Sequence, residues 1–273
     1  MAAANGRLPA SSKALKPETV RLTGRRLYVV TGASRGLGAA IAKQLLDPGH
    51  VVLCLSRHRN PALDGAERAA GACEQWTVDL AEPVEAAARL GAWLSVQDRA
   101  SFETATLINN AAALTAIGSI AECSAAELSS SLRVGLEAPL LLTAAFLRAT
   151  RDWPAAKRVL NISSGLGRRA MAGQAPYCAT KAGIDHLSRA LALDEALRPN
   201  GARVVSLAPG VIDTAMQGHL RAGDAAAFPE REHFVGLKQR GQLASPDEAA
   251  ARVLAYLHRA DFGATPVADV RDA

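Results

Sequence analysis

The chain has 273 residues, of which 49% are hydrophobic and only 4% aromatic, enough for one sizeable α/β domain with an aliphatic core. The net charge of +5 lies in residues 1–26, which hold six basic residues and one acidic residue, so the remaining chain is neutral and a basic nucleic-acid surface is excluded. No stretch approaches the roughly 20 apolar residues of a membrane helix, and four scattered cysteines without a Cys-x-x-Cys pair indicate a reducing, cytoplasmic setting and argue against a zinc or other metal site.

Residues 1–26 are predicted to form a tail before the folded domain. They are rich in Ala, Ser, Lys and Arg and lack the continuous apolar segment of a secretory signal. Their arginine and serine content leaves a transit peptide open, although Pro9 and Pro17 interrupt a long amphipathic helix. We expect a disordered extension, followed by a single domain over residues 27–273.

A glycine-rich turn follows the first predicted strand. Residues 27–31 form a short apolar run rich in β-formers, and residues 39–46 have helical character up to Pro48. Between them, residues 31–38 read Thr-Gly-Ala-Ser-Arg-Gly-Leu-Gly. Strand, glycine turn and helix in this order predict a phosphate cradle, because glycines admit the backbone to a pyrophosphate and the helix N-terminus supplies N–H groups.

Strand-like and helix-like segments alternate along the rest of the chain. Near-continuous apolar strands indicate that both faces of the sheet are covered, so we predict one Rossmann-type, doubly wound α/β domain with a parallel sheet of about seven strands. Capping-box patterns predict helices that open at Ser124 and Ser245. The strands found by composition and spacing are 27–31, 51–55, 75–78, 105–108, 157–162 and 202–207.

One predicted helix carries a tyrosine and a lysine four residues apart. It begins at Pro176 and ends at the Pro-Asn-Gly of residues 199–201. Tyr177 and Lys181 share one face of this helix, about one turn apart. A phenol beside a fixed ammonium group ionises more easily and can exchange a proton with a substrate oxygen near neutral pH. Alone, the pair is equally compatible with a surface helix and a snorkelling lysine.

Residues 211–244 depart from the alternating pattern. Four glycines and Pro229 are mixed with apolar side chains that include Met216, Phe228 and Phe234. The segment follows a strand end, where open α/β sheets bind ligands, so we predict a mobile substrate lid. A long surface insertion with short helices is the alternative.

In these features the chain resembles the short-chain dehydrogenases/reductases from Leu27 to its C-terminus, and within them the branch of the sepiapterin reductases and bacterial benzil reductases. The resemblance implies that Ser164, rather than Ser163, binds the substrate carbonyl. It also implies that Tyr177 donates the proton, while Lys181 lowers the tyrosine pKa and reaches the nicotinamide ribose. The motifs that carry the resemblance are Thr31–Gly38, Asp79, Asn109-Asn110-Ala111, Ser164, Tyr177-x-x-x-Lys181 and Pro209-Gly210.

The resemblance also implies a nicotinamide dinucleotide. An acidic residue after the second strand would favour NAD, but the chain has Arg57 there and Arg35 in the glycine turn, and two guanidinium groups can clamp a 2′-phosphate. We therefore expect NADPH/NADP. By resemblance, Asp79 contacts the adenine and Thr214 the nicotinamide carboxamide. The expected cofactor residues are Gly32, Ser34, Arg35, Gly36, Leu37, Gly38, Arg57, Asp79, Leu80, Asn110, Ala111, Tyr177, Lys181, Pro209, Gly210, Val211 and Thr214.

Three further positions concern catalysis and substrate. The family commonly has an asparagine in the long central helix, where this chain has Gly135. A glycine keeps the main-chain carbonyl that helps to hold a water beside the lysine in the family, so Gly135→Asn is expected to leave activity intact or raise it. Asp269 matches the acidic pterin anchor of sepiapterin reductases, with a solvated carboxylate as the alternative. Met216 is the other expected substrate contact.

Together these features predict an NADPH-dependent carbonyl reductase that transfers hydride to a bulky ketone or diketone, benzil-like or on a pterin side chain, with Tyr177 as general acid. Reduction of a 3-oxoacyl thioester is a second enzymatic interpretation, in which Arg168 and Arg169 meet an acidic carrier. A catalytically weak NADPH-binding regulator is the interpretation from another class. The resemblance and the apolar residues 138–147 predict a homodimer or homotetramer, without nucleic-acid or membrane partners.

Overall fold

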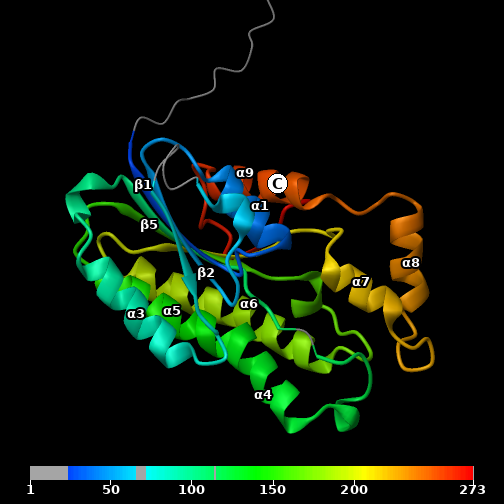
Figure 1. Ribbon diagram of the computed structural model, residues 1–273. Coiled ribbons are helices and arrows are strands. Elements are labelled where there is room, and N and C mark those ends of the chain that lie inside the picture. Colours follow the sequence, from blue (N-terminus) through cyan, green and yellow to red (C-terminus); the bar gives the residue numbers. More distant parts are fainter. Residues whose placement is uncertain (1–23, 66–71, 114, 273) are drawn as a thin grey trace, which may run out of the picture.

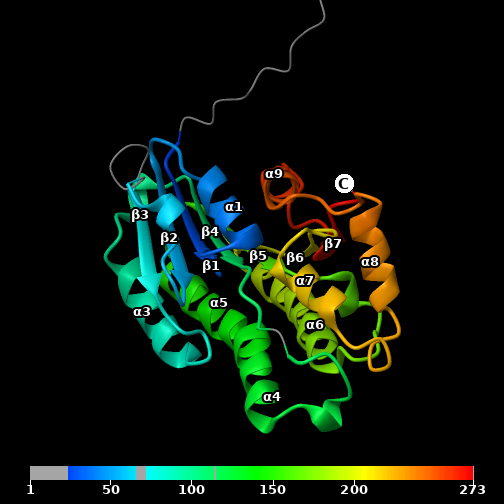
Figure 2. The same cartoon turned by 45° about the vertical axis from the view of Figure 1, so that its right-hand side comes forward.

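The computed structural model describes residues 24–65, 72–113 and 115–272. Seven parallel strands form one sheet in the order β3-β2-β1-β4-β5-β6-β7, which confirms the predicted doubly wound α/β domain (Figures 1 and 2). The chain runs from β1 through β2 to β3 on one side and then crosses to β4 on the other side of β1, so β2 and β4 both pair with β1. Ligands bind at the carboxyl ends of the strands beside such a reversal. The strands are β1 (Arg26–Thr31), β2 (His50–Ser56), β3 (Ala72–Thr77), β4 (Thr104–Asn109), β5 (Ala156–Ile162), β6 (Arg203–Ala208) and β7 (Val267–Asp269).

Helices cover both faces of the sheet. Alternate residues of β1 point to opposite sides: Tyr28 and Val30 join the apolar cluster that contains α1 and α9, whereas Leu27 and Val29 join the cluster that contains α3 and α5. Figure 2 shows α1 and α9 on one side of the sheet and α3, α5 and α6 on the other. The helices are α1 (Gly36–Gln44), α3 (Pro83–Ser95), α4 (Ala125–Leu132), α5 (Ala138–Ala149), α6 (Ala175–Ala196), α7 (Ala215–Ala222), α8 (Arg231–Gln239) and α9 (Pro246–Leu257).

Both predicted capping boxes are present. The Ser124 hydroxyl accepts from the Glu127 backbone N–H, and the Glu127 carboxylate accepts from the Ser124 backbone N–H. Ser245 and Glu248 make the same pair of bonds at the start of α9. These bonds satisfy N–H groups that would otherwise be unpaired at a helix start.

The observed boundaries differ from those predicted by one residue at most strand ends and by three residues at the start of β3. Strand β1 begins at Arg26, a buried residue that the sequence assigned to the tail; residues 1–23 of that tail lie outside the described residues. Strand β3 begins at Ala72 rather than at residue 75. Strand β7 has only three residues, too few for an apolar pattern to mark it.

The longest helix among the described residues contradicts the expectation that no stretch is long and apolar enough to cross a membrane. Helices α4 and α5 are joined by a π-helical turn, Arg133–Glu137, and the continuous helix Ala125–Ala149 has the length and apolar composition to cross a membrane. The same composition occurs in core helices of globular domains. Here Leu142 and Phe146 are fully buried in the cluster between sheet and helices, and α5 packs against α3, so the apolar side chains cover the sheet.

Candidate active site

The glycine turn after β1 has a backbone that only glycine tolerates well. Gly32 and Gly36 have φ values of 70° and 57°, in the left-handed region. A Cβ atom at Gly38 would lie 2.3 Å from the Gly32 carbonyl oxygen and 2.4 Å from Asn110 Nδ2. Each glycine therefore removes a clash or a strained conformation, and the turn stays open at the carboxyl edge of the sheet.

The start of α1 fits a pyrophosphate. Helix α1 begins at Gly36, and the preceding Arg35 makes no side-chain cap with its first turn. Backbone N–H groups at such a helix start bind anions together with the helix dipole. Arg35 and Arg57 are both exposed and follow the ends of the paired strands β1 and β2, at Thr31 and Ser56. The residues present therefore fit a dinucleotide.

Thr31 binds the glycine turn to the turn after β4. Its hydroxyl oxygen accepts from the backbone N–H groups of Asn110 and Ala111, at 2.9 and 3.0 Å. Asn110 Nδ2 donates back to the Thr31 carbonyl oxygen at 3.0 Å. Two of the expected cofactor residues are thus held against the cradle by a threonine to which the sequence analysis assigned no role.

The other expected cofactor residues line the same edge. Asp79 is exposed just after β3, where its carboxylate accepts from the Ala81 N–H, and Leu80 beside it is buried. Gly210 follows β6 with a φ of 81°. Thr214 precedes α7, and a Cβ at Gly36 would lie 3.5 Å from its Cγ2, so the start of α7 lies against the glycine turn. The remaining members of this edge group are Ser34, Leu37, Pro209 and Val211.

Ser164, Tyr177 and Lys181 come together at this edge. Ser164 follows β5, and its hydroxyl accepts from the Leu166 N–H and shares a hydrogen bond with Tyr177. Lys181 Nζ lies 5.6 Å from the centre of the Tyr177 ring. The Lys181 ammonium is buried and donates to the Ile162 carbonyl oxygen at 2.7 Å. The structure therefore holds a hydroxyl, a phenol and an ammonium group in one cluster.

The expected acidification of the tyrosine is not found. Burial raises the pKa of Tyr177 to about 12, and the hydrogen bond with Ser164 lowers it only in part. Burial also lowers the pKa of Lys181 to about 8, against which the Asp185 carboxylate acts. The phenol therefore carries its proton at neutral pH, which suits a proton donor, while much of the lysine remains charged.

Ser163, the serine set aside in favour of Ser164, has a different environment. It is 3% exposed, and its hydroxyl donates to Asp185 Oδ1 at 2.6 Å. Asp185 is 1% exposed and lies one turn after Lys181 on α6. The sequence analysis missed this carboxylate because an aspartate in the middle of a helix usually faces solvent; its spacing of four from Lys181 was the available signal.

Gly135 lies in the π-helical turn, packed against α6. It is buried, and a Cβ there would lie 3.0 Å from both Cβ and Cγ2 of Thr180, tighter than ordinary side-chain contacts. Thr180 precedes Lys181, and its hydroxyl donates to the Tyr177 carbonyl oxygen. The prediction that Gly135→Asn leaves activity intact is therefore revised, because any larger side chain pushes on the turn that carries Tyr177 and Lys181.

Helices α7 and α8 form the segment predicted as a lid. Its two ends meet in an isolated bridge between Ile212 and Ala244. Phe228 and Phe234 stack with ring centres 5.6 Å apart, in an apolar cluster with Met171 and Leu220. The cluster also contacts partly buried apolar side chains beside the catalytic group, namely Ile117, Leu166, Cys178 and Leu237. Of these, Leu166 and Cys178 are near Ser164 and Tyr177 in the chain, whereas Phe228 and Phe234 are buried inside the segment.

The two expected substrate residues differ in surroundings. Met216 is partly exposed in the first turn of α7. Asp269 ends β7, is 5% exposed, and accepts from Arg271 Nε and Nη2 at 2.8 and 2.6 Å. Arg271 holds the pKa of Asp269 below its usual value. The carboxylate is therefore neither solvated nor free, since a guanidinium group of the chain occupies both of its oxygens.

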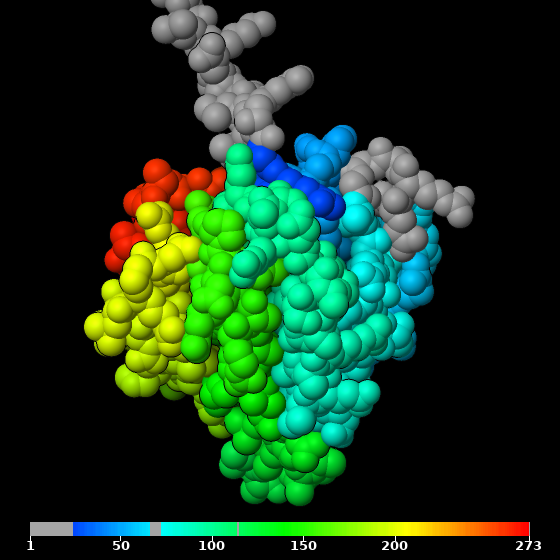
Figure 3. Space-filling view, turned by 90° about the vertical axis from the view of Figure 1, so that its left-hand side faces the viewer, coloured from blue at the N-terminus to red at the C-terminus, as the bar shows by residue number. Residues whose placement is uncertain are grey.

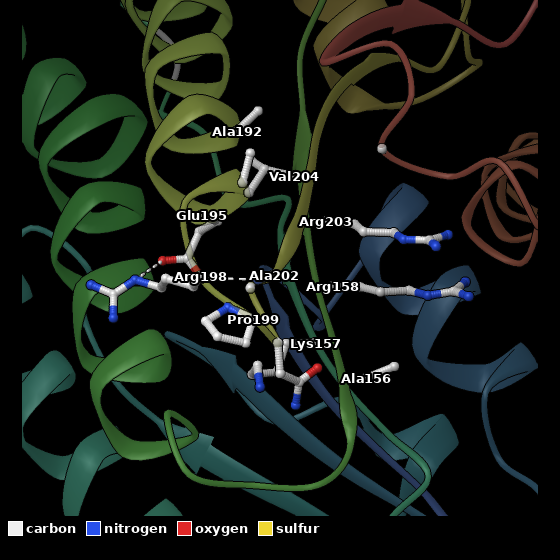
Figure 4. Close-up of a pocket in the computed structure, with 14 residues that line it drawn as sticks. Ala156, Lys157, Arg158, Ala192, Glu195, Arg198, Pro199, Ala202, Arg203 and Val204 are labelled. Atoms are coloured by element: carbon white, nitrogen blue, oxygen red, sulfur yellow. Dashed lines mark hydrogen bonds and ion pairs between the residues drawn. The ribbon is translucent and has the colours of Figure 1, made fainter.

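A separate cavity of about 520 Å³ lies at the opposite edge of the sheet, between the end of α6 and the starts of β5 and β6 (Figure 4). Arg158 and Arg203 point away from it and donate to carbonyls of Leu257 and Ala260, near the end of α9. Arg198 turns to the other side, where it pairs with Glu195. The basic groups diverge, so the cavity is no built anion site.

Comparison with known proteins gives consistent matches. The family model described as short chain dehydrogenase matches residues 26–225. The chain is similar to the benzil reductase ((S)-benzoin forming) of Bacillus cereus, 32% identical over 87% of this chain and 96% of that protein. It is 35% identical to the sepiapterin reductase of Mus musculus, over 88% and 94%. A solved dehydrogenase from Agrobacterium tumefaciens with bound NADP is 27% identical, with a TM-score of 0.73 over 91% and 95%.

Proposed function

The chain belongs to the short-chain dehydrogenase family of oxidoreductases, which bind a nicotinamide cofactor, and from this membership we propose that it is an NADPH-dependent carbonyl reductase for bulky ketones or diketones. The observation that carries the proposal is the cluster of Ser164, Tyr177 and Lys181 beside the glycine turn. Neither the turn nor the cluster alone would suffice, because each has ordinary structural uses.

Ser164, Tyr177 and Lys181 each have a separate role in the reduction. When bound, the cofactor supplies the hydride. Ser164 orients the substrate carbonyl, and the protonated Tyr177 gives its proton to the developing alkoxide, which is more basic than a phenolate. Lys181 places a positive charge near the resulting phenolate and stabilises it. Lys181 and the residues of the glycine turn would hold the cofactor, with Thr214 closing the groove from the α7 side.

The preference for NADPH is supported by Arg35 and Arg57. Both are exposed at neighbouring strand ends, where a 2′-phosphate would meet two guanidinium groups. The solved relative from Agrobacterium tumefaciens holds NADP. We expect the reducing cytoplasm as the site of action, because the four cysteines are scattered along the chain without a Cys-x-x-Cys pair.

A bulky, apolar substrate is supported by the partly exposed Met216 and by the partly exposed Leu166 and Cys178, which are close to Ser164 and Tyr177 in the chain. The similar proteins act on benzil and on sepiapterin by their names. Arg168 and Arg169, which an acidic carrier would need, already have partners within the chain: Asp185 and Ala268 for the first, Glu230 for the second. This engagement favours the diketone over the 3-oxoacyl thioester.

Tyr177→Phe tests the proposal. The variant keeps the ring and loses the proton donor, so we expect kcat/KM for a diketone to fall by about 10²–10⁴-fold while NADPH binds with unchanged affinity. A panel of diketones and 3-oxoacyl thioesters, each with NADPH and NADH, identifies the substrate class. Tyr256→Phe, a partly buried tyrosine on α9, is the matched control. A wild-type protein that binds NADPH without reducing any ketone would support the regulator instead.

A further inference from the structure

Asp185 is a buried carboxylate that the proposed mechanism does not use. It is 1% exposed, one turn after Lys181 on α6. Its Oδ1 accepts from two hydroxyls, Ser163 at 2.6 Å and Ser206 at 2.7 Å. These serines lie at the end of β5 and within β6, so one oxygen atom ties α6 to two strands beside Ser164.

The other oxygen faces positive charge. Asp185 Oδ2 lies 3.3 Å from Arg168 Nε and has no hydrogen-bond partner among the described residues. The guanidinium group of Arg168 donates its Nη2 hydrogen to the Ala268 carbonyl oxygen in β7 instead. Gly167 lets the segment after β5 pack closely against α6, because a Cβ there would lie 2.8 Å from Asp185 Oδ2 and 2.9 Å from the Lys181 carbonyl oxygen.

Burying a charge without nearby compensation is costly, so an ionised carboxylate at this depth needs opposite charge around it. Arg168, about one-third exposed, lies beside Asp185 Oδ2, and the buried Lys181 lies one turn before Asp185 on α6. The only hydrogen bond described for the Lys181 ammonium goes to the neutral Ile162 carbonyl. Without Lys181 the buried negative charge of Asp185 is therefore not fully compensated, and the same holds for the positive charge of Lys181 without Asp185.

We propose that Asp185 is a positioning residue for Lys181: it supplies the buried negative charge that keeps the ammonium group protonated and fixes α6 on the strand ends that carry Ser164. The effect on turnover rests on the proposed reductase function, whereas the effect on lysine protonation does not. The direction agrees with the pKa of Lys181, which burial lowers and Asp185 raises.

The groups around Asp185 determine in which direction each variant should move the titration of Lys181. Strands β5 and β6 face it with the neutral Ser163 and Ser206, and the segment after β5 faces it with Arg168. On α6 itself the neighbours are Lys181 and, one turn further, Tyr177; Asp269 of β7 acts on Arg168. Loss of the Asp185 charge should favour neutral Lys181, and loss of the Arg168 charge should favour charged Lys181.

Titration of lysine side chains by NMR tests the proposal without any turnover. The chain has six lysines, and the Lys181 Cε resonance is assigned by its loss in Lys181→Met. We expect wild-type Lys181 to titrate near pH 8, Asp185→Asn to lower this midpoint by about one pH unit or more, and Arg168→Gln to raise it. Glu195→Gln, a buried carboxylate three turns along α6, should leave it unchanged.

The pH profile of kcat/KM supplies the second readout. Its alkaline limb should move in Asp185→Asn by the same shift as the Lys181 resonance, an effect that lost packing alone would not produce. If the Lys181 midpoint is unchanged in Arg168→Gln, and in Asp185→Asn where that variant folds, the positioning role is overturned. If instead the midpoints shift but wild-type protein reduces no ketone, the positioning role stands and the reductase function fails.

Discussion

Lys181 carries a buried positive charge, and its cost to folding depends on pH. In the native protein its pKa is about 8, against 10.5 for an ordinary lysine. Between these values the unfolded chain binds more protons at this site than the native protein, so the free energy of unfolding rises with pH. Below pH 8 both states are protonated, and the full cost of burial remains.

Lys181→Met should remove this pH dependence. From pH 8 to 10 we expect the free energy of unfolding of wild type to rise relative to the variant by roughly 1 kcal/mol per pH unit. Denaturant unfolding at several pH values measures the difference. Lys43→Met, at an exposed lysine of α1, should show no such trend. Parallel curves for wild type and Lys181→Met would mean that the ammonium has an ordinary pKa.

Arg35 and Arg57 should decide between the two nicotinamide cofactors. Each would contribute a charge-assisted hydrogen bond to a 2′-phosphate, so replacing either with alanine should raise KM for NADPH by about tenfold or more. KM for NADH, which lacks this phosphate, should change little. Steady-state kinetics with both cofactors measure the ratio. Arg151→Ala, exposed before the opposite end of β5, is the control; equal losses with both cofactors would contradict the proposed contact.

At the scale of elements, the π-helical turn packs closely against α6 behind the catalytic group. Gly135 meets Thr180 with no room for a Cβ at normal distance. Gly135→Asn should therefore cost about 1–3 kcal/mol of stability and lower kcat, because α6 must shift with Tyr177 on it. Thermal unfolding and turnover measure the two effects.

Two further variants distinguish steric crowding at position 135 from the general cost to stability of a glycine in a helix. Gly91→Ala, in α3 where a Cβ meets nothing within 4 Å, should stabilise the protein by about 0.5–1 kcal/mol. Thr180→Ser removes the Cγ2 atom that meets position 135, so combining it with Gly135→Ala should recover much of the loss. Additive losses in the double variant would show that the two residues do not interact.

At the scale of the whole molecule, one face exposes apolar side chains that a subunit contact would cover. In Figure 3 the green α4 and α5 segment runs down the middle of a face, between the cyan α3 segment and yellow residues at the end of α6. Leu193 and Leu197 on or just after α6 are 72% and 86% exposed, and Leu132 and Leu140 are about half exposed. These leucines support the expected homodimer or homotetramer.

The double variant Leu193→Glu and Leu197→Glu should convert such an assembly to monomers, because charges in an apolar interface lose their hydration. Light scattering after size exclusion measures the mass. Val84→Glu on α3, where the valine is 69% exposed, is the matched control. A wild-type protein that is already monomeric would contradict the expectation.

Most of this architecture could be predicted from local sequence patterns. The rest depends on contacts between residues that lie far apart in the chain. The glycine turn, the Tyr177 helix and two capping boxes depend on residues within a few positions of each other, so the sequence shows them directly. Thr31 and Asp185 make hydrogen bonds to partners 79 and 22 residues away in the chain, and local patterns do not identify those partners. The tyrosine pKa was predicted in the wrong direction, because burial raises it by more than the Ser164 hydroxyl lowers it.

The central place of β1 has a consequence for biosynthesis. Strand β1 is buried along its whole length, and β4, its partner on one side, is made long after β2 and β3. A nascent chain that has reached β3 therefore exposes an unpaired, apolar strand edge, the kind of surface on which chains aggregate. Substitutions that delay pairing of β4 should lower the yield of soluble protein while leaving the specific activity of the folded molecules unchanged.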